Sequence, residues 1–140
     1  MIVVPYTADH LARLNAQPQQ MKIGRFLTPE HAIALQSHLS FTALEGDTVL
    51  ACSGVVEIWK GRAIAWAVLS GDLKGKFLPI HRAVQRFLDC APFDRIEADV
   101  DIDFKEGHRW LQKLGFVMEN PRARKYRPDG GDSSIYARVK

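Results

Sequence analysis

The sequence predicts an α+β fold in one domain (residues 1–140), with a mixed central sheet flanked by helices. Segments with apolar residues at helical spacing alternate along the chain with segments whose apolar residues recur at every second position. Two short turns, EGD at 45–47 and KGR at 60–62, join three β-rich segments as in an antiparallel meander. A chain of 140 residues can also bury one substantial hydrophobic core.

The first third of the chain begins with the β-branched segment MIVVPYT, followed by two segments with helix-start signals. Thr7 or Asp9 can cap the first helix, and Thr28 with Pro29 behind it is a favourable start for the second. These signals predict a strand at 1–7, a short helix at 7–16, a connection at 17–27 and a helix at 28–39.

The middle of the chain changes from a period of two to helical spacing. The predicted strands of the meander are 40–45, 48–58 and 63–70. The segment 72–92 is predicted to be helical, and Pro79 is tolerated if the helix begins only one or two residues before it. The apolar face of this helix consists of Leu73, Phe77, Ile80, Val84, Phe87 and Leu88.

The segment 93–104, FDRIEADVDIDF, alternates strictly between apolar and acidic residues and predicts a half-buried strand. Asp103 and Glu106 then resemble a capping box for a helix that runs to Leu114 and ends at Gly115. The apolar side of the strand is Ile96, Ala98, Val100 and Ile102, and the acidic side is Glu97, Asp99, Asp101 and Asp103.

The last elements are two strands, FVMENPR at 116–122 and SSIYARVK at 133–140, joined across the polar turn RPDGGD. The predicted order of elements is therefore β-α-α-β-β-β-α-β-α-β-β.

The composition is ordinary for a globular protein, with 46% hydrophobic residues, 25% charged residues and a formal net charge of +3. No apolar run approaches the roughly 20 residues that span a bilayer. The N-terminal segment also lacks the features of a secretion signal, so we expect a cytoplasmic protein without a membrane partner. The mild positive charge suits an anionic small ligand without selecting one.

The cysteines and tryptophans are interpreted as packing residues. Cys52 and Cys90 lie far apart in apolar contexts and are expected to be buried free thiols, and no metal site is predicted. Trp59, Trp66 and Trp110 are interpreted as core aromatics, although Trp66 is also a candidate for the lining of a ligand pocket.

The order of elements and the segment 66–117 resemble the GNAT superfamily of N-acetyltransferases. WAVLSGDLKGKFLPIHRAVQRFL (66–88) stands at the place of the acyl-CoA-binding strand, loop and helix, and RIEADVDIDFKEGHRWLQKLGF (95–116) at that of the next strand and helix. The resemblance implies a sheet whose fourth and fifth strands splay apart. It also implies acetyl-CoA or another acyl-CoA in the resulting cleft, and an amine of a small molecule or protein as acceptor.

By this resemblance the backbone of Val68, Leu69 and Ser70 would hold pantetheine. A helix N-terminus attracts anions, and a cluster of cations there is understandable if a phosphate binds. A solvated basic loop capped by Asp72 is the alternative. The candidate residues for the pyrophosphate are Lys74, Gly75, Lys76, Phe77 and Arg82.

Two motifs of the family are incomplete here. The glycine-rich loop is reduced to DLKGKF, with Gly75 alone and Phe77 at the position of the second glycine. In EGHRWLQKLGF, Leu111 stands where the family often has the tyrosine that protonates the leaving thiolate. Other residues that could supply a proton, without a spacing argument, are Ser70, His108, Tyr126 and Tyr136.

The amine also needs a base, and the predicted fourth strand carries no carboxylate. The candidate catalytic residues are Glu57 on the neighbouring strand and Asp101 in the acidic row that also contains Glu97 and Asp99. The row could hold a cationic acceptor or supply the base. The simpler alternative in each case is a polar residue on a solvated strand face.

Two functions follow from these patterns: an acyl-CoA-dependent N-acyltransferase, or a catalytically inactive protein of the same shape. A narrower resemblance, carried by 66–71, Lys76 and 110–116, is to small internal virion (core) proteins of short-tailed phages. In that case virion proteins would be the partners and the virion the location. Nucleic-acid binding by the basic loop 121–128 rests on charge alone and is not expected.

Overall fold

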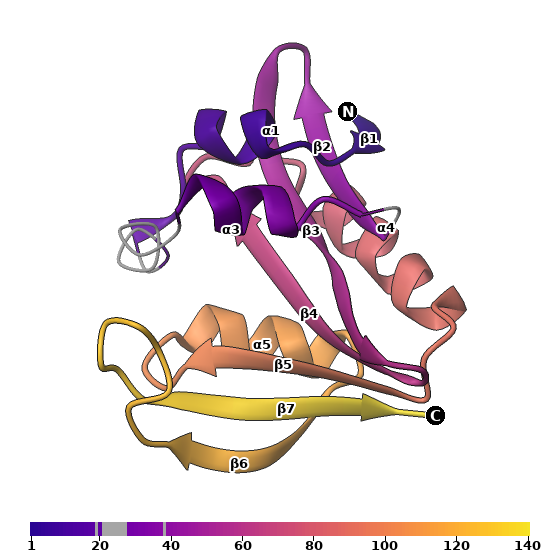
Figure 1. The fold of residues 1–140 in the computed structure, drawn as a ribbon. Coiled ribbons are helices and arrows are strands. Elements are labelled where there is room, and N and C mark those ends of the chain that lie inside the picture. The colour runs from indigo at the N-terminus through magenta and orange to yellow at the C-terminus, as the bar shows by residue number, and fades with distance from the viewer. Residues whose placement is uncertain (19, 21–27, 38) are drawn as a thin grey trace.

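The computed structural model describes residues 1–18, 20, 28–37 and 39–140. The order of its elements is the predicted one (Figure 1). Most of the connection predicted at 17–27 lies outside the described residues. The elements are β1 (Ile2–Pro5), α1 (Ala8–Arg13), α3 (Pro29–Ala34), β2 (Ser40–Glu45), β3 (Thr48–Trp59), β4 (Arg62–Leu69), α4 (Phe77–Cys90), β5 (Arg95–Asp101), α5 (Lys105–Lys113), β6 (Val117–Ala123) and β7 (Ser133–Val139).

The strands form one mixed sheet in the order β1-β2-β3-β4-β5-β7-β6, in which β4 and β5 are parallel and the other neighbours antiparallel. The predicted α+β architecture is confirmed. The helices α4 and α5 cover one face, where Leu88, Ile96 and Leu114 share a core cluster. The helices α1 and α3 lie over β2–β4 on the other face, and no described helix covers that face of β5, β7 and β6 (Figure 1).

The sheet opens between β4 and β5. The two strands pair only at Arg62↔Arg95, Ala63↔Ile96 and Ile64↔Glu97, and β4 then continues to Leu69 without a partner strand on that side. Figure 1 shows the two strands diverging from this point. Five residues of β4 thus present an unpaired backbone edge, and backbone groups so exposed need other hydrogen-bond partners.

Several helix ends agree with the sequence. Thr7 and Thr28 are the N-caps of α1 and α3, each with a capping box. The helix α4 begins at Phe77, two residues before Pro79, because proline is accepted only in the first turn. Gly115 ends α5 with a φ of 90°, a left-handed conformation that favours glycine.

The predicted capping box of Asp103 and Glu106 is wrong. Phe104 is the N-cap of α5, and it makes no side-chain cap. The helix begins one residue later than predicted, because the turn after β5 extends to Phe104, whose amide donates to the Asp101 carbonyl at 2.9 Å. Asp103 therefore lies outside the helix. Instead of capping it, Glu106 forms an ion pair in which its Oε1 lies 3.7 Å from Nη2 of Arg109.

Two packing predictions are also wrong. Cys90 is exposed, because it ends α4 on the solvent side, whereas Cys52 is buried as expected. Trp59 is 61% exposed and lies at the end of β3, where its ring stacks over the guanidinium of Arg62. None of the described helices is long and apolar enough to cross a membrane.

Candidate active site

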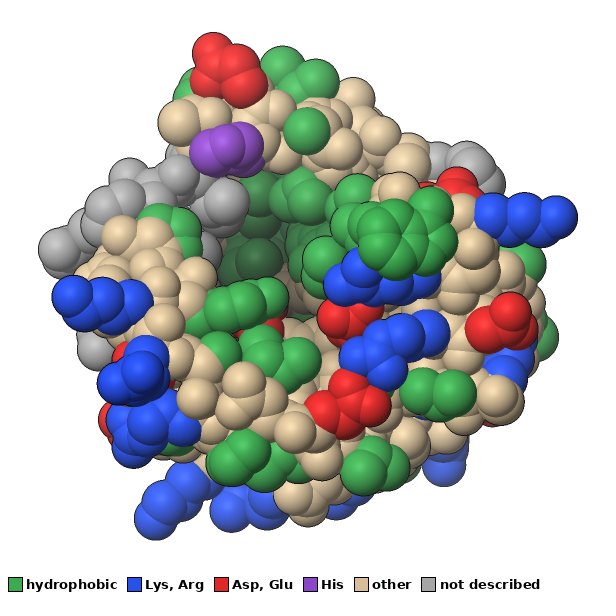
Figure 2. Space-filling view, turned by 60° about the horizontal axis from the view of Figure 1, so that its bottom comes forward, with side chains coloured by type: hydrophobic (Ala, Val, Ile, Leu, Met, Phe, Trp, Pro, Cys, Tyr) green, Lys and Arg blue, Asp and Glu red, His purple; other side chains and the backbone are tan. Residues whose placement is uncertain are grey.

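A cleft of about 1290 Å³ occupies the opening between β4 and β5 and extends under α1, α3, α4 and α5. Its lining is mostly apolar, and Figure 2 shows it as a deep hollow surrounded by hydrophobic side chains. The polar side chains that line it come from several elements, among them β5, α5, the β6–β7 loop and the glutamines Gln17 and Gln20. A concave apolar cavity with a few converging polar groups is the usual form of a small-molecule site.

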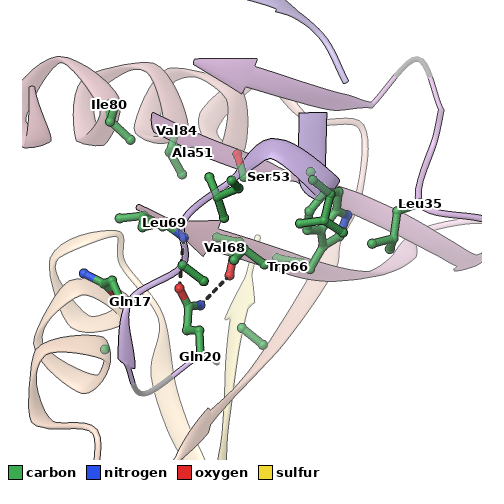
Figure 3. A pocket seen from close by; sticks show the side chains of 18 of the residues that line it. Gln17, Gln20, Leu35, Ala51, Ser53, Trp66, Val68, Leu69, Ile80 and Val84 are labelled. Atoms are coloured by element: carbon green, nitrogen blue, oxygen red, sulfur yellow. Dashed lines mark hydrogen bonds between the residues drawn. The ribbon is translucent and has the colours of Figure 1, made fainter. Parts of the chain in front are cut away.

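The side chain of Gln20 binds the unpaired edge of β4. Its Nε2 donates to the Ala67 carbonyl at 2.8 Å, and its Oε1 accepts from the Leu69 amide at 2.9 Å (Figure 3). A single carboxamide therefore donates to and accepts from β4 as the N–H and C=O of one residue in an added parallel strand would. The edge is able to bind an amide, and in this structure the protein's own glutamine occupies it.

Backbone groups of Asn15 and Gln17 bind the end of β4. The Gln17 amide donates to the Leu69 carbonyl at 2.9 Å, and the Gly71 amide donates to the Asn15 carbonyl at 2.9 Å. Ser70 is also engaged, because its amide donates to the Leu50 carbonyl at 2.7 Å. Of the three residues predicted to hold pantetheine, Val68 and Leu69 line the cleft and Ser70 is buried beside it.

The start of α4 gathers four of the predicted phosphate residues, Lys74, Gly75, Lys76 and Phe77. Lys76 is the N-cap, no side chain caps the helix, and its first turn contains no acidic residue. Lys74 and Gly75 have φ values of 51° and 73°, so the loop turns sharply into the helix. The fifth candidate, Arg82, is exposed further along α4, and of the five candidates only Phe77 lines the cleft.

An aromatic cluster connects α4 to α5 at the edge of the cleft. Phe77 stacks on His81 at 6.1 Å between centroids and meets Trp110 edge-on at 5.8 Å. The Trp110 indole donates to Nδ1 of His81 at 3.1 Å. Phe77, at the position of the family's second glycine, therefore joins the two helices beside the predicted phosphate loop.

The two predicted bases occupy different places. Glu57 is exposed near the end of β3 and does not line the cleft. Asp101 lines the cleft, but its Oδ2 lies 3.4 Å from Nη2 of the half-buried Arg127. Asp101 is therefore already paired with a cation of the protein itself.

Asp99, which the sequence presented only as a member of the acidic row, is better placed. It lines the cleft two residues beyond the last β4–β5 pair. Solvent reaches it through the cleft, yet the surrounding protein atoms raise the pKa of its carboxyl, an effect that a contact with Ser133 and the charge of Arg127 only partly offset. Among the described residues no basic side chain forms an ion pair with it.

The residues considered as proton donors differ in whether they line the cleft. Leu111 lines the cleft, as its alignment with the family's tyrosine implies. His108 and the fully buried Tyr136 hydrogen bond to each other at 2.7 Å and do not line the cleft. Tyr126 does line it, and burial together with the charge of Asp99 raises the pKa of its hydroxyl.

Comparison with solved structures identifies the architecture. Ard1 from Thermoplasma volcanium superposes with a TM-score of 0.79 at 14% identity, covering 99% of this chain and 96% of that chain. An acetyltransferase of the GNAT family from Bacillus anthracis gives 0.68 at 14% identity, covering 98% and 93%. The chain has the GNAT fold. The NatC complex bound to Gag peptide and CoA also contains it, with a TM-score of 0.67, 11% identity and coverages of 99% and 98%.

No protein-family model and no curated protein sequence matches the chain. The GNAT fold is therefore identified by structural similarity alone, and the incomplete glycine loop and Leu111 agree with the absence of a sequence match. The splayed strands, expected from the family resemblance, are present. Gln20 was not predicted, because a glutamine in a polar connection carries no signal that it will reach the edge of a distant strand.

Proposed function

We propose that this GNAT-fold protein transfers an acyl group from acyl-CoA to an amine. The observation that carries the proposal is the edge of β4, where the Ala67 carbonyl and the Leu69 amide face the cleft and bind the carboxamide of Gln20. Pantetheine contains amide groups with the same donor and acceptor. Its binding at this edge would replace the two hydrogen bonds of Gln20, so this side chain acts as an internal competitor.

The start of α4 supports the same assignment. The backbone amides in the first turn of a helix lack intrahelical acceptors and favour an anion. Lys74 and Lys76 add positive charge there, which Asp72 partly offsets because its Oδ2 lies 3.7 Å from Nζ of Lys74. The first turn of the helix itself contains no acidic residue. The loop 70–76 directly connects the end of β4 to the start of α4. A CoA molecule with its pantetheine amides on β4 would therefore have its pyrophosphate near this helix start.

The reaction would proceed by direct attack. Asp99 removes a proton from the acceptor ammonium, directly or through water, and the nitrogen lone pair attacks the thioester carbonyl. A C–N bond forms, the C–S bond breaks and the electron pair leaves with sulfur, while the second proton of the nitrogen neutralises the thiolate. A free thiol has a pKa of about 8.5, so thiolate departure without the family's tyrosine is slower but feasible.

Calorimetric titration with CoA and acetyl-CoA tests the proposal. The variants Lys74→Glu and Lys76→Glu place negative charge beside the predicted phosphate, whereas Lys60→Glu reverses an exposed charge in the β3–β4 turn and serves as the matched control. We expect micromolar binding to the wild type, a loss of tenfold or more in the two loop variants, and no change in the control.

Absence of binding at millimolar ligand to both the wild type and Gln20→Ala would contradict the proposal. The cleft would then be closed, and the catalytically inactive alternative would be favoured. Equal losses in Lys60→Glu and Lys76→Glu would also contradict it, because the effect would then be one of net charge alone.

A further inference from the structure

The carboxylates on the open face of β5 have unequal partners. Glu97 is bound by Arg62 through two hydrogen bonds and lies 3.3 Å from Arg95. Asp101 is paired with Arg127 at 3.4 Å. Asp99, between them, has as its only hydrogen-bond partner among the described residues the hydroxyl of Ser133, 3.4 Å away. The acidic row therefore offers one carboxylate without a cation.

The strand register places Asp99 opposite an aromatic side chain. The last β4–β5 pair is Ile64↔Glu97, and side chains two residues further along each strand point to the same face. These are Trp66 and Asp99, at the point where the strands have just separated, and both line the cleft. Trp66 lies on the α1 face, because it packs edge-on against Tyr6 at 5.1 Å between centroids.

The surroundings of this pair are apolar. Leu11 and Leu14 of the α1 segment, Leu35 after α3 and Val68 of β4 line the same cleft. Figure 3 shows Val68 beside Gln20, Trp66 next along β4, and Leu35 on the far side of Trp66. The indole nitrogen of Trp66 is buried and has no hydrogen-bond partner among the described residues. Asp99 is exposed beside this apolar surface, and a carboxylate that has no cation of the protein as partner gains from a bound ammonium.

We propose that this end of the cleft binds a monocationic primary amine with an apolar body, its ammonium on Asp99 and its body against Trp66 and the leucines of α1. An ammonium would neutralise the one unpaired carboxylate and could also lie against the indole ring. A polyamine would find no second free carboxylate in the acidic row of β5, because arginines already neutralise Glu97 and Asp101. The proposal rests on the acyl-transfer function proposed above and names its acceptor class.

This chemistry is shared by two sources, a free small amine and a peptide N-terminus that begins with an apolar residue. The probes are 2-phenylethylamine, the neutral analogue 2-phenylethanol, spermidine, and a tripeptide with N-terminal leucine. Binding is measured without acyl-CoA by NMR titration of the wild type, of Asp99→Asn, and of Asp103→Asn as the control. Asp103 follows the same strand but does not line the cleft.

We expect 2-phenylethylamine or the leucyl peptide to bind to the wild type. The affinity should be tenfold weaker in Asp99→Asn and unchanged in Asp103→Asn. The ligand that binds more tightly shows whether the acceptor is a free small amine or a peptide N-terminus. Circular dichroism checks that each variant is folded. Equal binding to Asp99→Asn, tighter binding of spermidine, or no binding by any amine would overturn the proposal. Because acyl-CoA is absent, these outcomes are independent of cofactor binding, whose failure would instead contradict the proposed function.

Discussion

The strands β4 and β5 border the same cleft but present different groups to it. β4 offers backbone: from Ala65 to Leu69 it carries no ionisable side chain, and its edge binds the carboxamide of Gln20. β5 offers side chains, because Asp99 and Asp101 of its acidic row line the cleft. The comparison separates two tasks. A backbone edge holds a chain that contains amides whatever the side chains are, whereas a carboxylate selects the charge of its ligand.

The largest expected effect concerns the side chains of β5. If Asp99 accepts the proton of the amine, Asp99→Asn should lower kcat/KM by about 10²–10⁴, the usual contribution of a general base. Glu57→Gln should change it by less than about twofold, because Glu57 lies outside the cleft. The measurement is the rate of CoA release with a primary amine. A large loss in Glu57→Gln and none in Asp99→Asn would reverse the assignment.

The next effect isolates the backbone edge of β4. Gln20→Ala removes the internal competitor, whose two hydrogen bonds each contribute about 0.5–1.5 kcal/mol. We expect the affinity for CoA to rise about tenfold and the affinity for amines to stay unchanged, as measured by calorimetry. Gln112→Ala, an exposed position on α5, is the control. A weaker affinity for CoA in Gln20→Ala would mean that the glutamine contacts the ligand and does not compete with it.

A smaller effect tests the claim that the other acids of β5 are already neutralised. Glu97→Gln removes the charge that holds Arg62 and Arg95, and it should lower the free energy of unfolding by about 1 kcal/mol. Amine affinity should remain within about twofold of the wild type. Chemical denaturation and NMR titration measure the two quantities. A tenfold loss of amine affinity would show that Glu97 also serves as a binding residue.

The smallest effect is a pH dependence of stability. The pKa of Asp99 is raised in the folded state, so the folded protein binds this proton more readily than the unfolded chain. The ionised carboxylate therefore destabilises the fold at neutral pH, and stability from this group increases as the pH falls through the raised pKa. Asp99→Asn should be more stable than the wild type at pH 7, with the difference vanishing in acid. Denaturation curves of both proteins across this range measure it.

The sequence predicts the part of the site that depends on strong local patterns. The alternation at 95–101 identifies β5 and its acidic row, and the spacing of Leu73 to Leu88 identifies α4 with Pro79 in its first turn. The meander follows from its glycine turns, where Gly46 and Gly61 have φ values of 58° and 92°. Each of these signals lies within a few residues of the feature that it predicts.

What the sequence misses depends on contacts between distant segments. Gln20 binds Ala67 and Leu69, which are more than forty residues away in the sequence, and no pattern near Gln20 predicts that contact. The choice among Glu97, Asp99 and Asp101 depends on which arginines reach them, since Arg62 and Arg127 belong to other elements. The exposure of Trp59 is of the same kind, because it depends on the end of β3 extending past the helices.

The most direct test of a working cleft is an NMR titration with CoA that follows the Leu69 amide and the side-chain amide of Gln20. We expect the Gln20 NH₂ signals to shift toward solvent-exposed values as CoA is added. The Leu69 amide should stay protected from hydrogen exchange, because its acceptor changes from Gln20 to the ligand. Unchanged signals for both groups at millimolar CoA would contradict the proposed binding of CoA at the edge of β4 and would favour a catalytically inactive protein.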